Sequence, residues 1–377
     1  MSIKPQPRLR FFDHPDSYAV FPVPHVHKML PVEHFVNKFA EENPSNPFHA
    51  MVGQEMAKRT LKRAAINAMM RWDHACVKNF LVTGPTSVGK TTMVRLFAKI
   101  LRLPLVEISP KAFTKMDDVF KFIRQSIQSY KPAGMTNPNA VIELIPQQSE
   151  RHFELPPCII FIDEAHALHK GLQNELLKAI EAKDRRFCTE KGCIVKTDNV
   201  CWFFATTETG DLFGPLLNRF TEINLQPYTR EQIAQIVSRN FPEWSAELCR
   251  AVAYYEGRVP RRAISFAQTL NEEIAQNPTV HWKFLIQNVA EENQVDEYGL
   301  HLRHLKILKL LRGKPVSKTR LAQHLQVSEN ELLRLIVPPI MMNTEDMPAL
   351  ITVCQQGFCL TAEGEAELAK RDEDLDV

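Results

Sequence analysis

The spacing of apolar residues predicts helices and strands in alternation from about residue 54 onward. Over 55–71, apolar positions such as Leu61, Ala65 and Met69 recur every three or four residues, as one buried face of a helix requires. Short apolar runs at 79–84 and 103–109 have the length of strands, and a stretch of helical period follows each of them. The predicted order of this region is therefore helix, strand, helix, strand, helix.

Two further segments, 158–163 and 199–207, each contain an unbroken apolar run of five or more residues. Runs without polar alternation are typical of strands in a parallel sheet that is covered on both faces. The fold class that this pattern predicts is α/β.

The pattern changes twice in the second half of the chain. After residue 227 it is helical only, and Thr229 with Gln232 has the spacing of a capping box. From about 298, three helices precede a strand–turn–strand at 349–364, which is the order of a winged helix. We expect five parts: a proline-rich N-terminal extension (1–47), a large α/β domain (48–226) with a proline-rich insert (129–157), a small helical domain (227–296), a winged-helix domain (297–366) and a solvated acidic tail (367–377).

Composition narrows the function classes. With 44% hydrophobic and 24% charged residues the chain is globular, and its net charge of +2 means that nucleic-acid contacts must come from local patches. No apolar run reaches the ~18–20 residues of a membrane helix, and the first residues lack the apolar core of a secretory signal. The eight cysteines include no CxxC pair. We expect a reduced, cytoplasmic protein without a membrane partner.

One loop carries a specific chemical signature. Residues 84–91 read GPTSVGKT and match GxxxxGK[ST] between a predicted strand and a predicted helix. Glycines let main-chain N–H groups approach phosphates, Lys90 would reach the β- and γ-phosphates, and the Thr91 hydroxyl would ligate Mg²⁺. A glycine turn without a ligand is the alternative, and it leaves this position between strand and helix unexplained. The predicted ATP-binding residues of this loop are Gly84, Pro85, Thr86, Ser87, Val88, Gly89, Lys90, Thr91 and Thr92.

A second signature follows the buried strand 158–162. Asp163 and Glu164 come directly after it, so both carboxylates should lie at the edge of the sheet where the phosphates bind. Asp163 would hold Mg²⁺, and Glu164 would orient and deprotonate the attacking water, as phosphoryl transfer to water requires.

Five further motifs occur in a fixed order along the chain. They are Met51-Val52-Gly53-Gln54, Asp163-Glu164-Ala165-His166, Ala205-Thr206-Thr207, Pro215–Phe220 and Gly257–Arg261. With these motifs and the phosphate loop, the chain resembles the AAA+ superfamily, and within it the RuvB family of Holliday-junction branch-migration motors. The resemblance covers roughly residues 48–365 and implies a P-loop AAA+ parallel-sheet domain, a small helical lid domain and a C-terminal winged helix.

The resemblance also implies roles for matched residues. Thr207 would hold the attacking water together with Glu164, and Arg219 would be an arginine finger that reaches the nucleotide of a neighbouring subunit. Arg261 would contact the γ-phosphate in its own subunit, with Arg262 as the alternative. Val52 and Gly53 would border the adenine. The implied cofactors are ATP and Mg²⁺, and the implied assembly is a ring, a hexamer.

Three features depart from the RuvB pattern. The insert 129–157 falls near the region where AAA+ rings contact a threaded substrate. The hairpin expected at 185–198, where RuvB-like motors dock a junction-binding protein, has a charged tip at 190–192. The wing turn 355–358 has no Lys or Arg, although wings that bind DNA carry cations for phosphates.

A basic segment precedes that wing. Between Gly299 and Gln323 the chain has no carboxylate, and three histidines (301, 304 and 324) add to its cations. We expect a DNA-backbone contact here, with a solvated helix face as the alternative. Because the presumed recognition helix starts with Glu329 and Glu331, binding should be independent of base sequence. The predicted DNA-binding residues are Arg303, Lys306, Lys309, Arg312, Lys314, Lys318 and Arg320.

The sequence thus predicts a ring-forming, Mg-ATP-dependent DNA translocase or helicase that acts on duplex or branched DNA in recombination, repair or replication. A junction-binding or nuclease protein would be its partner. The alternative is an AAA+ switch or loader that remodels or recruits a protein partner on DNA. A winged-helix regulator with an incidental ATPase is a third reading, which the full set of catalytic motifs disfavours.

Overall fold

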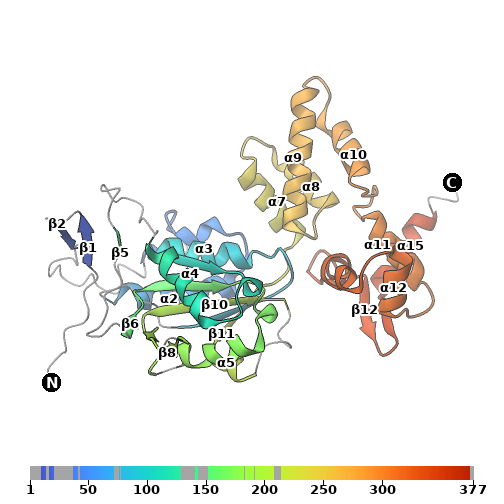
Figure 1. Cartoon of the computed structure of the whole chain (residues 1–377). Helices are drawn as coiled ribbons and strands as arrows, with labels where there is room; N and C mark the ends of the chain where they lie inside the picture. The colour runs from blue at the N-terminus through green and yellow to red at the C-terminus, as the bar shows by residue number, and fades with distance from the viewer. Residues whose placement is uncertain are drawn as a thin grey trace. The chain divides into compact units, whose positions relative to one another are not determined.

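The structure is a computed structural model of the 377-residue chain. It describes residues 10–13, 17–20, 37–40, 43–71, 76, 78–128, 141–142, 152–181, 183–190, 192–207 and 214–373. Contacts divide the chain into two units (Figure 1). The first comprises 1–84 and 89–225, and the second comprises 85–88 and 226–377.

A five-stranded parallel sheet forms the centre of the first unit, with the strand order β11-β3-β10-β7-β4. All five residues of β7 and all seven of β10 are buried, as their unbroken apolar sequences predict. The α/β prediction is therefore confirmed. The strands are β3 (Phe80–Thr83), β4 (Leu105–Ile108), β7 (Cys158–Ile162), β10 (Val200–Thr206) and β11 (Thr221–Asn224).

Helices cover the sheet and complete its core (Figure 1). Phe97 of α3 packs on Phe80 and Phe203, whose rings stack with centroids 4.9 Å apart. A second cluster joins apolar side chains of α4 and α5 to β4, β7 and β10, around the buried Trp202. The helices of this unit are η1 (Pro47–Ala50), α2 (Glu55–Met69), α3 (Lys90–Leu101), η2 (Pro110–Ala112), α4 (Met116–Gln128), η3 (Ala165–Ala167), α5 (Lys170–Ala179) and α6 (Gly214–Leu217).

Two small sheets also belong to the first unit. The predicted hairpin exists as β8 (Arg186–Cys188) and β9 (Ile194–Lys196), and β6 (His152–Glu154) adds a third, parallel strand to β9. The other sheet pairs β1 (Arg10–Asp13) with β2 (Ser17–Val20) and with β5 (Val141–Ile142). The proline-rich insert thus contributes a strand to each sheet. Most of the N-terminal extension, and residues 129–140 and 143–151 of the insert, lie outside the described residues.

The second unit starts with four helices. They are α7 (Arg230–Asn240), α8 (Ala246–Tyr255), α9 (Pro260–Gln276) and α10 (Trp282–Glu292). The predicted capping box is confirmed, because Thr229 and Gln232 bond each other's main-chain N–H groups.

The winged helix follows within the same unit. Val316 bridges Phe358 of the wing, and one apolar cluster that includes Ile307, Leu321, Leu332 and Phe358 fills the interior. The winged-helix prediction is therefore confirmed in its order of elements. These are α11 (Leu302–Leu311), α12 (Lys318–Leu325), α13 (Glu329–Glu331), the π-helical η4 (Leu332–Ile336), α14 (Val337–Met341), β12 (Ile351–Cys354), β13 (Gly357–Leu360) and α15 (Ala362–Glu373).

The C-terminal tail differs from the prediction. We expected a solvated tail from residue 367, but α15 continues to Glu373 and its Arg371 is 8% exposed. Arg371 Nε donates to Asp296 Oδ2 at 2.7 Å, so an ion pair to the segment before α11 holds the helix end in place. Among the described helices, none combines the length and apolar character that crossing a bilayer requires.

Candidate functional site

The phosphate loop connects β3 to α3 with the backbone geometry that its glycines allow. Gly84 has φ 141° and Gly89 has φ 94°, conformations that L side chains rarely adopt. Ser87 also lies in the left-handed region, at φ 65°. Since α3 begins at Lys90, the loop presents the N–H groups of a helix N-terminus, which bind anions.

Lys90 lies within this loop. Its Nζ donates to the carbonyl oxygen of Gly84 at 2.9 Å. Burial lowers the pKa of Lys90, while the carboxylates of Glu164 and Asp163 act in the opposite direction. The amine is therefore placed near both carboxylates, in the position that a phosphate-binding lysine needs. Within the second unit, the Tyr228 hydroxyl donates to the Val88 carbonyl at 3.1 Å, which anchors the middle of the loop.

The residues predicted to hold Mg²⁺ are in contact. Thr91 Oγ1 donates to Asp163 Oδ2 at 2.8 Å, across 72 positions of sequence. A hydroxyl and a carboxylate are the hard oxygen ligands that Mg²⁺ prefers. The two side chains therefore fit the ion that the sequence predicts.

Glu164 has a different environment from its neighbour Asp163. Its φ is 52°, an uncommon conformation for a residue with a side chain, and half of the side chain is exposed. One carboxylate oxygen lies 3.4 Å from His166 Nδ1, and that nitrogen lies 3.0 Å from Thr206 Oγ1. The His166 ring thus orients the Glu164 carboxylate, which remains accessible to water, as a residue that activates water must be.

Two residues without a predicted role lie near Glu164. His166 is buried, and Thr206 at the end of β10 contacts it. Thr207, the predicted sensor, is the next residue after β10 and is partly exposed. The aspartate–glutamate–alanine–histidine motif was the available signal for His166. Its meaning depends on β10 lying next to β7 in the sheet.

Arg219 lies after α6 and forms an ion pair in its own subunit. Its Nη2 lies 2.9 Å from Glu181 Oε2, and its Nε donates to the same oxygen at 3.1 Å. Its Nη1 donates to the carbonyl of Pro215. One N–H from each nitrogen suffices for these contacts, which leaves two of the five N–H groups of a guanidinium for another acceptor. The arginine-finger role stays a prediction.

A buried network supports Glu181. Arg185 Nε donates to the Glu181 carbonyl at 2.9 Å, and Arg185 Nη2 contacts Asn79 Oδ1. Asn79 Nδ2 in turn donates to the carbonyls of Ile180 and Arg219. Asn79, directly before β3, and Arg185, directly before β8, therefore hold the main chain on both sides of the Glu181–Arg219 pair.

The structure also shows where the other residues predicted to contact the nucleotide lie, and their roles stay predictions. Val52 is buried, and Gly53 has φ 58° just before α2. Arg261 is exposed in the first turn of α9, whereas the alternative, Arg262, donates to Glu256 at 2.8 Å. The structure therefore leaves Arg261 as the better candidate of the two for contacting a ligand.

The predicted DNA-binding residues divide into two groups. All seven are exposed, but three pair with acids of the same domain: Arg303 with Glu331, Arg312 with Asp372, and Lys318 with Glu329. Four exposed cations have no ion pair among the described residues, namely Lys306, Lys309, Lys314 and Arg320. The strongest candidates for phosphate contact thus lie on α11, on α12 and in the turn between them.

The histidines require a correction. We counted His301 and His304 with the basic face, but His304 is buried and burial lowers its pKa to about 3. Burial also lowers the pKa of His301 to about 4. Both rings are neutral at physiological pH, so they add no charge for DNA.

The hairpin tip also differs from a projecting docking element. Lys115 Nζ lies 3.0 Å from a carboxylate oxygen of Glu190, and the Glu190 N–H donates to Asp117 Oδ1. These contacts tie the described part of the tip to the start of α4, and Lys191 lies outside the described residues.

Comparison with known proteins agrees with this geometry. Residues 80–228 match the model of the ATPase family associated with various cellular activities (AAA). The Holliday junction branch migration complex subunit RuvB of Fervidobacterium nodosum is 25% identical over 305 residues, covering 76% of this chain and 78% of that protein. RuvB of a Nitratiruptor species is 26% identical, covering 82% and 89%.

Solved structures agree at the level of the fold. The Thermotoga maritima RuvB Holliday junction branch migration motor superposes with a TM-score of 0.64 at 23% identity, covering 84% of this chain and 95% of that one. A point mutant of that RuvB gives a TM-score of 0.66 at 22% identity. The AAA match spans the phosphate loop and both carboxylates, and the relatives cover most of the chain. Residues 80–228 therefore form an AAA-type ATPase domain, an ATP hydrolase, in a chain that resembles RuvB.

Proposed function

We propose that this chain is the subunit of a ring, a hexamer, that uses Mg-ATP hydrolysis to move along or remodel duplex or branched DNA in recombination, repair or replication. The observation that carries the proposal is the pairing of an ATPase site with a winged helix whose cations remain exposed. A functional parallel is the branch migration activity named for the RuvB relatives.

The chain's own residues divide the work of hydrolysis. Lys90 and the N–H groups of the phosphate loop bind the phosphates. Glu164, oriented by His166, takes the proton of the attacking water. Bound Mg²⁺ would neutralise charge on the phosphate oxygens, and Thr91 and Asp163 are the residues that would hold it.

Completion of the site depends on a second subunit. The two remaining N–H groups of Arg219 would bond the γ-phosphate of a neighbour, a contact that stabilises charge in phosphoryl transfer. Glu181 holds the guanidinium from its other side. Hydrolysis would then require ring assembly.

DNA contact is assigned to Lys306, Lys309, Lys314 and Arg320. These cations have no ion pair in the part of the chain that the structure describes. Such side chains displace counterions from DNA when they bind its phosphates, which gives affinity without base recognition. The acidic start of the recognition helix, at Glu329 and Glu331, supports binding that is independent of sequence.

The test is ATP turnover at low salt without DNA and with linear duplex, a four-way junction or single strands. The proposal expects duplex or branched DNA to raise the rate, and negative-stain images of the Glu164→Gln protein with ATP to show rings around the duplex. Turnover that no DNA changes would contradict the DNA motor.

A specific observation favours the alternative function, an AAA+ switch or loader that acts on a protein. The recognition helix exposes Leu335 (64%), and the neighbouring strand β12 exposes Val353 (61%). Exposed apolar side chains beside acids suit a protein surface better than a phosphate backbone. This alternative expects a junction-binding or nuclease partner to bind in an ATP-dependent way, while DNA alone leaves turnover unchanged.

A further inference from the structure

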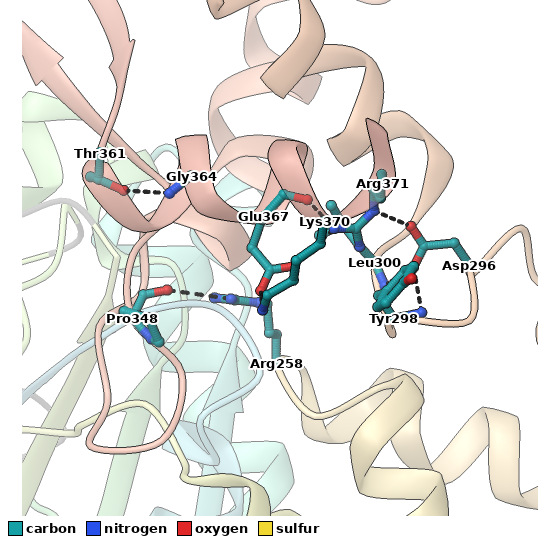
Figure 2. A network of polar contacts seen from close by, with 10 residues as sticks. All are labelled: Arg258, Asp296, Tyr298, Leu300, Pro348, Thr361, Gly364, Glu367, Lys370 and Arg371. Carbon is teal, nitrogen blue, oxygen red and sulfur yellow. Dashed lines mark hydrogen bonds and ion pairs between the residues drawn. The ribbon is translucent and has the colours of Figure 1, made fainter. Parts of the chain in front are cut away.

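Three arginines close together in sequence have three different environments. Arg261 is exposed at the start of α9, and Arg262 pairs with Glu256. Arg258, just before this helix, instead extends to the winged helix (Figure 2). Its Nη1 donates to the Pro339 carbonyl at 3.1 Å, and its Nη2 donates to the Pro348 carbonyl at 3.3 Å.

The two carbonyls belong to α14, which continues the recognition helix, and to the loop that follows α14. Pro339 is in α14, where the last carbonyls of a helix have no partner within the helix. A cation is favourable at this end of a helix dipole. Arg258 therefore caps the recognition helix from the lid.

Further contacts hold the loop 344–348, which follows α14, against the helical lid. The Arg230 N–H donates to Asp346 Oδ2 at 2.7 Å. A Cβ at Gly257 would lie 2.2 Å from the Ala253 carbonyl of the lid and 3.3 Å from Met347 Sδ of the loop, so the loop packs tightly on this glycine. Met347 itself is buried. The loop 344–348 is thus held in place by both polar and apolar contacts.

The position of Arg258 is costly for a charge. The two groups that accept hydrogen bonds from it are neutral carbonyls. Burial and the nearby Arg230 lower its pKa to about 10, so it remains charged at neutral pH. Placing a half-buried cation on two carbonyls gives a geometry that only the planar fork of arginine provides.

We propose that Arg258 is a positioning residue that fixes the winged helix to the segment carrying Arg261, so that movement of the lid during the ATP cycle is transmitted to the winged helix. The inference rests on the proposed function, because the transmitted movement matters only if the winged helix holds DNA. Both hydrogen bonds of Arg258 go to main-chain carbonyls of the winged-helix domain, so the residue acts through that contact.

The experiment compares the full-length wild type with Arg258→Met and Arg258→Lys. Arg250→Met is the matched control, since Arg250 is an exposed lid arginine whose nearest acid, Glu231, lies 3.6 Å away. Two quantities are measured: the ratio of ATP turnover with and without duplex DNA, and amide hydrogen exchange over residues 342–350 without nucleotide.

The proposal expects Arg258→Met to keep basal turnover, its KM for ATP and its DNA affinity, while the DNA-dependent increase falls about fivefold or more. Exchange over 342–350 should rise about tenfold, as expected for lost hydrogen bonds to a charged group. Arg258→Lys should restore part of both, because one ammonium can still bond one carbonyl. Arg250→Met should match the wild type.

Retained DNA stimulation in Arg258→Met would overturn the proposal. If DNA fails to stimulate even the wild type, the DNA motor fails, and the exchange result then decides the role of Arg258. Unchanged hydrogen exchange in Arg258→Met would then overturn the positioning role of Arg258, and raised exchange would support that role. Should Arg258→Met fail to fold, the same two readouts on Arg258→Lys apply.

Discussion

The adjacent carboxylates after β7 show how one pair of residues acquires two functions. Asp163 accepts hydrogen bonds from Thr91 Oγ1 and from the Glu164 N–H, so both of its oxygens are engaged. Glu164 is half exposed and is turned by its positive φ toward His166. The first is anchored as a ligand, and the second is available as a base.

The first prediction concerns these residues. Glu164→Gln should bind ATP with unchanged affinity while turnover falls about a hundredfold or more, because the amide cannot take a proton. Lys90→Ala should lose nucleotide binding, and Lys99→Ala, an exposed lysine of the same helix, should retain it. Fluorescent-nucleotide binding and steady-state turnover measure both. Normal turnover in Glu164→Gln would remove this residue from its role.

At this scale, sequence motifs located part of the site. The phosphate loop and the two carboxylates were predicted because their chemistry requires particular residues at fixed spacing. Glu181 and Thr206 were not, since their importance lies in contacts to Arg219 and His166 that form only after the strands align. The spacing of residues along the sequence does not indicate which distant side chains will form such pairs.

At the scale of the elements, the main-chain hydrogen-bond register of the recognition helix changes just before two prolines. Pro338 and Pro339 have no N–H, so the carbonyls four residues earlier lose their usual donors. The Val337 N–H bonds the Leu332 carbonyl, five residues back, and forms the π-turn of η4. The recognition helix therefore consists of α13 and η4, and α14 continues it directly.

The second prediction uses the buried histidine of α11. The His304 pKa falls from 6.5 to about 3 through burial, with Arg262 and His301 adding to the effect. In the unfolded chain the His304 side chain is therefore protonated below about pH 6.5, whereas in the folded chain it is protonated only below about pH 3. The free energy of unfolding should decrease by about 2 kcal/mol between pH 6.5 and 5 from this group.

Thermal or urea denaturation against pH measures this effect. His304→Gln has no group to titrate, so its stability should vary less with pH over the same interval. His324→Gln, at an exposed position of α12, is the control and should follow the wild type. Equal pH dependence in all three proteins would contradict the prediction.

The third prediction concerns the cations of the winged helix. Lys309→Glu with Lys314→Glu should weaken duplex binding and reduce its dependence on salt, because two phosphate contacts are lost. Arg239→Glu, an exposed lid residue, changes charge in the same direction and should have little effect. Fluorescence anisotropy at several salt concentrations gives both quantities. Equal losses in the lid and winged-helix variants would indicate a net-charge effect only.

For the whole molecule, the central question is whether one subunit completes the site of another. Arg219→Ala should bind ATP normally but lose turnover by about a thousandfold. Mixed with Lys90→Ala protein, it should regain activity, because Lys90→Ala subunits supply Arg219 to sites that keep Lys90. Absence of any recovery across mixing ratios would contradict action between subunits.

Glu181 provides a control for that experiment. Glu181→Gln keeps one acceptor but removes the charge that holds Arg219, so turnover should fall less than in Arg219→Ala while ATP binding stays unchanged. A loss as large as that of Arg219→Ala would mean that Glu181 has a role beyond positioning.

The overall architecture was largely predictable, for identifiable reasons. Buried strands such as β7 and β10 have long apolar runs, and the capping box at Thr229 marks the start of the helical lid. The pairing of β6 with β9 was not predictable, because strands of three residues leave almost no periodic signal. The extension of α15 depends on the ion pair between Arg371 and Asp296, 75 residues apart.

The pairing of β6 with β9 has a consequence for any shortened version of the chain. Removing the insert 129–157 would delete β6 and leave the hydrogen-bonding edge of β9 bare. Such an edge is a template for strands of other molecules, so the truncated protein should self-associate even with its ATPase core intact. Besides any role with a substrate, the insert 129–157 would then prevent aggregation by covering the edge of β9.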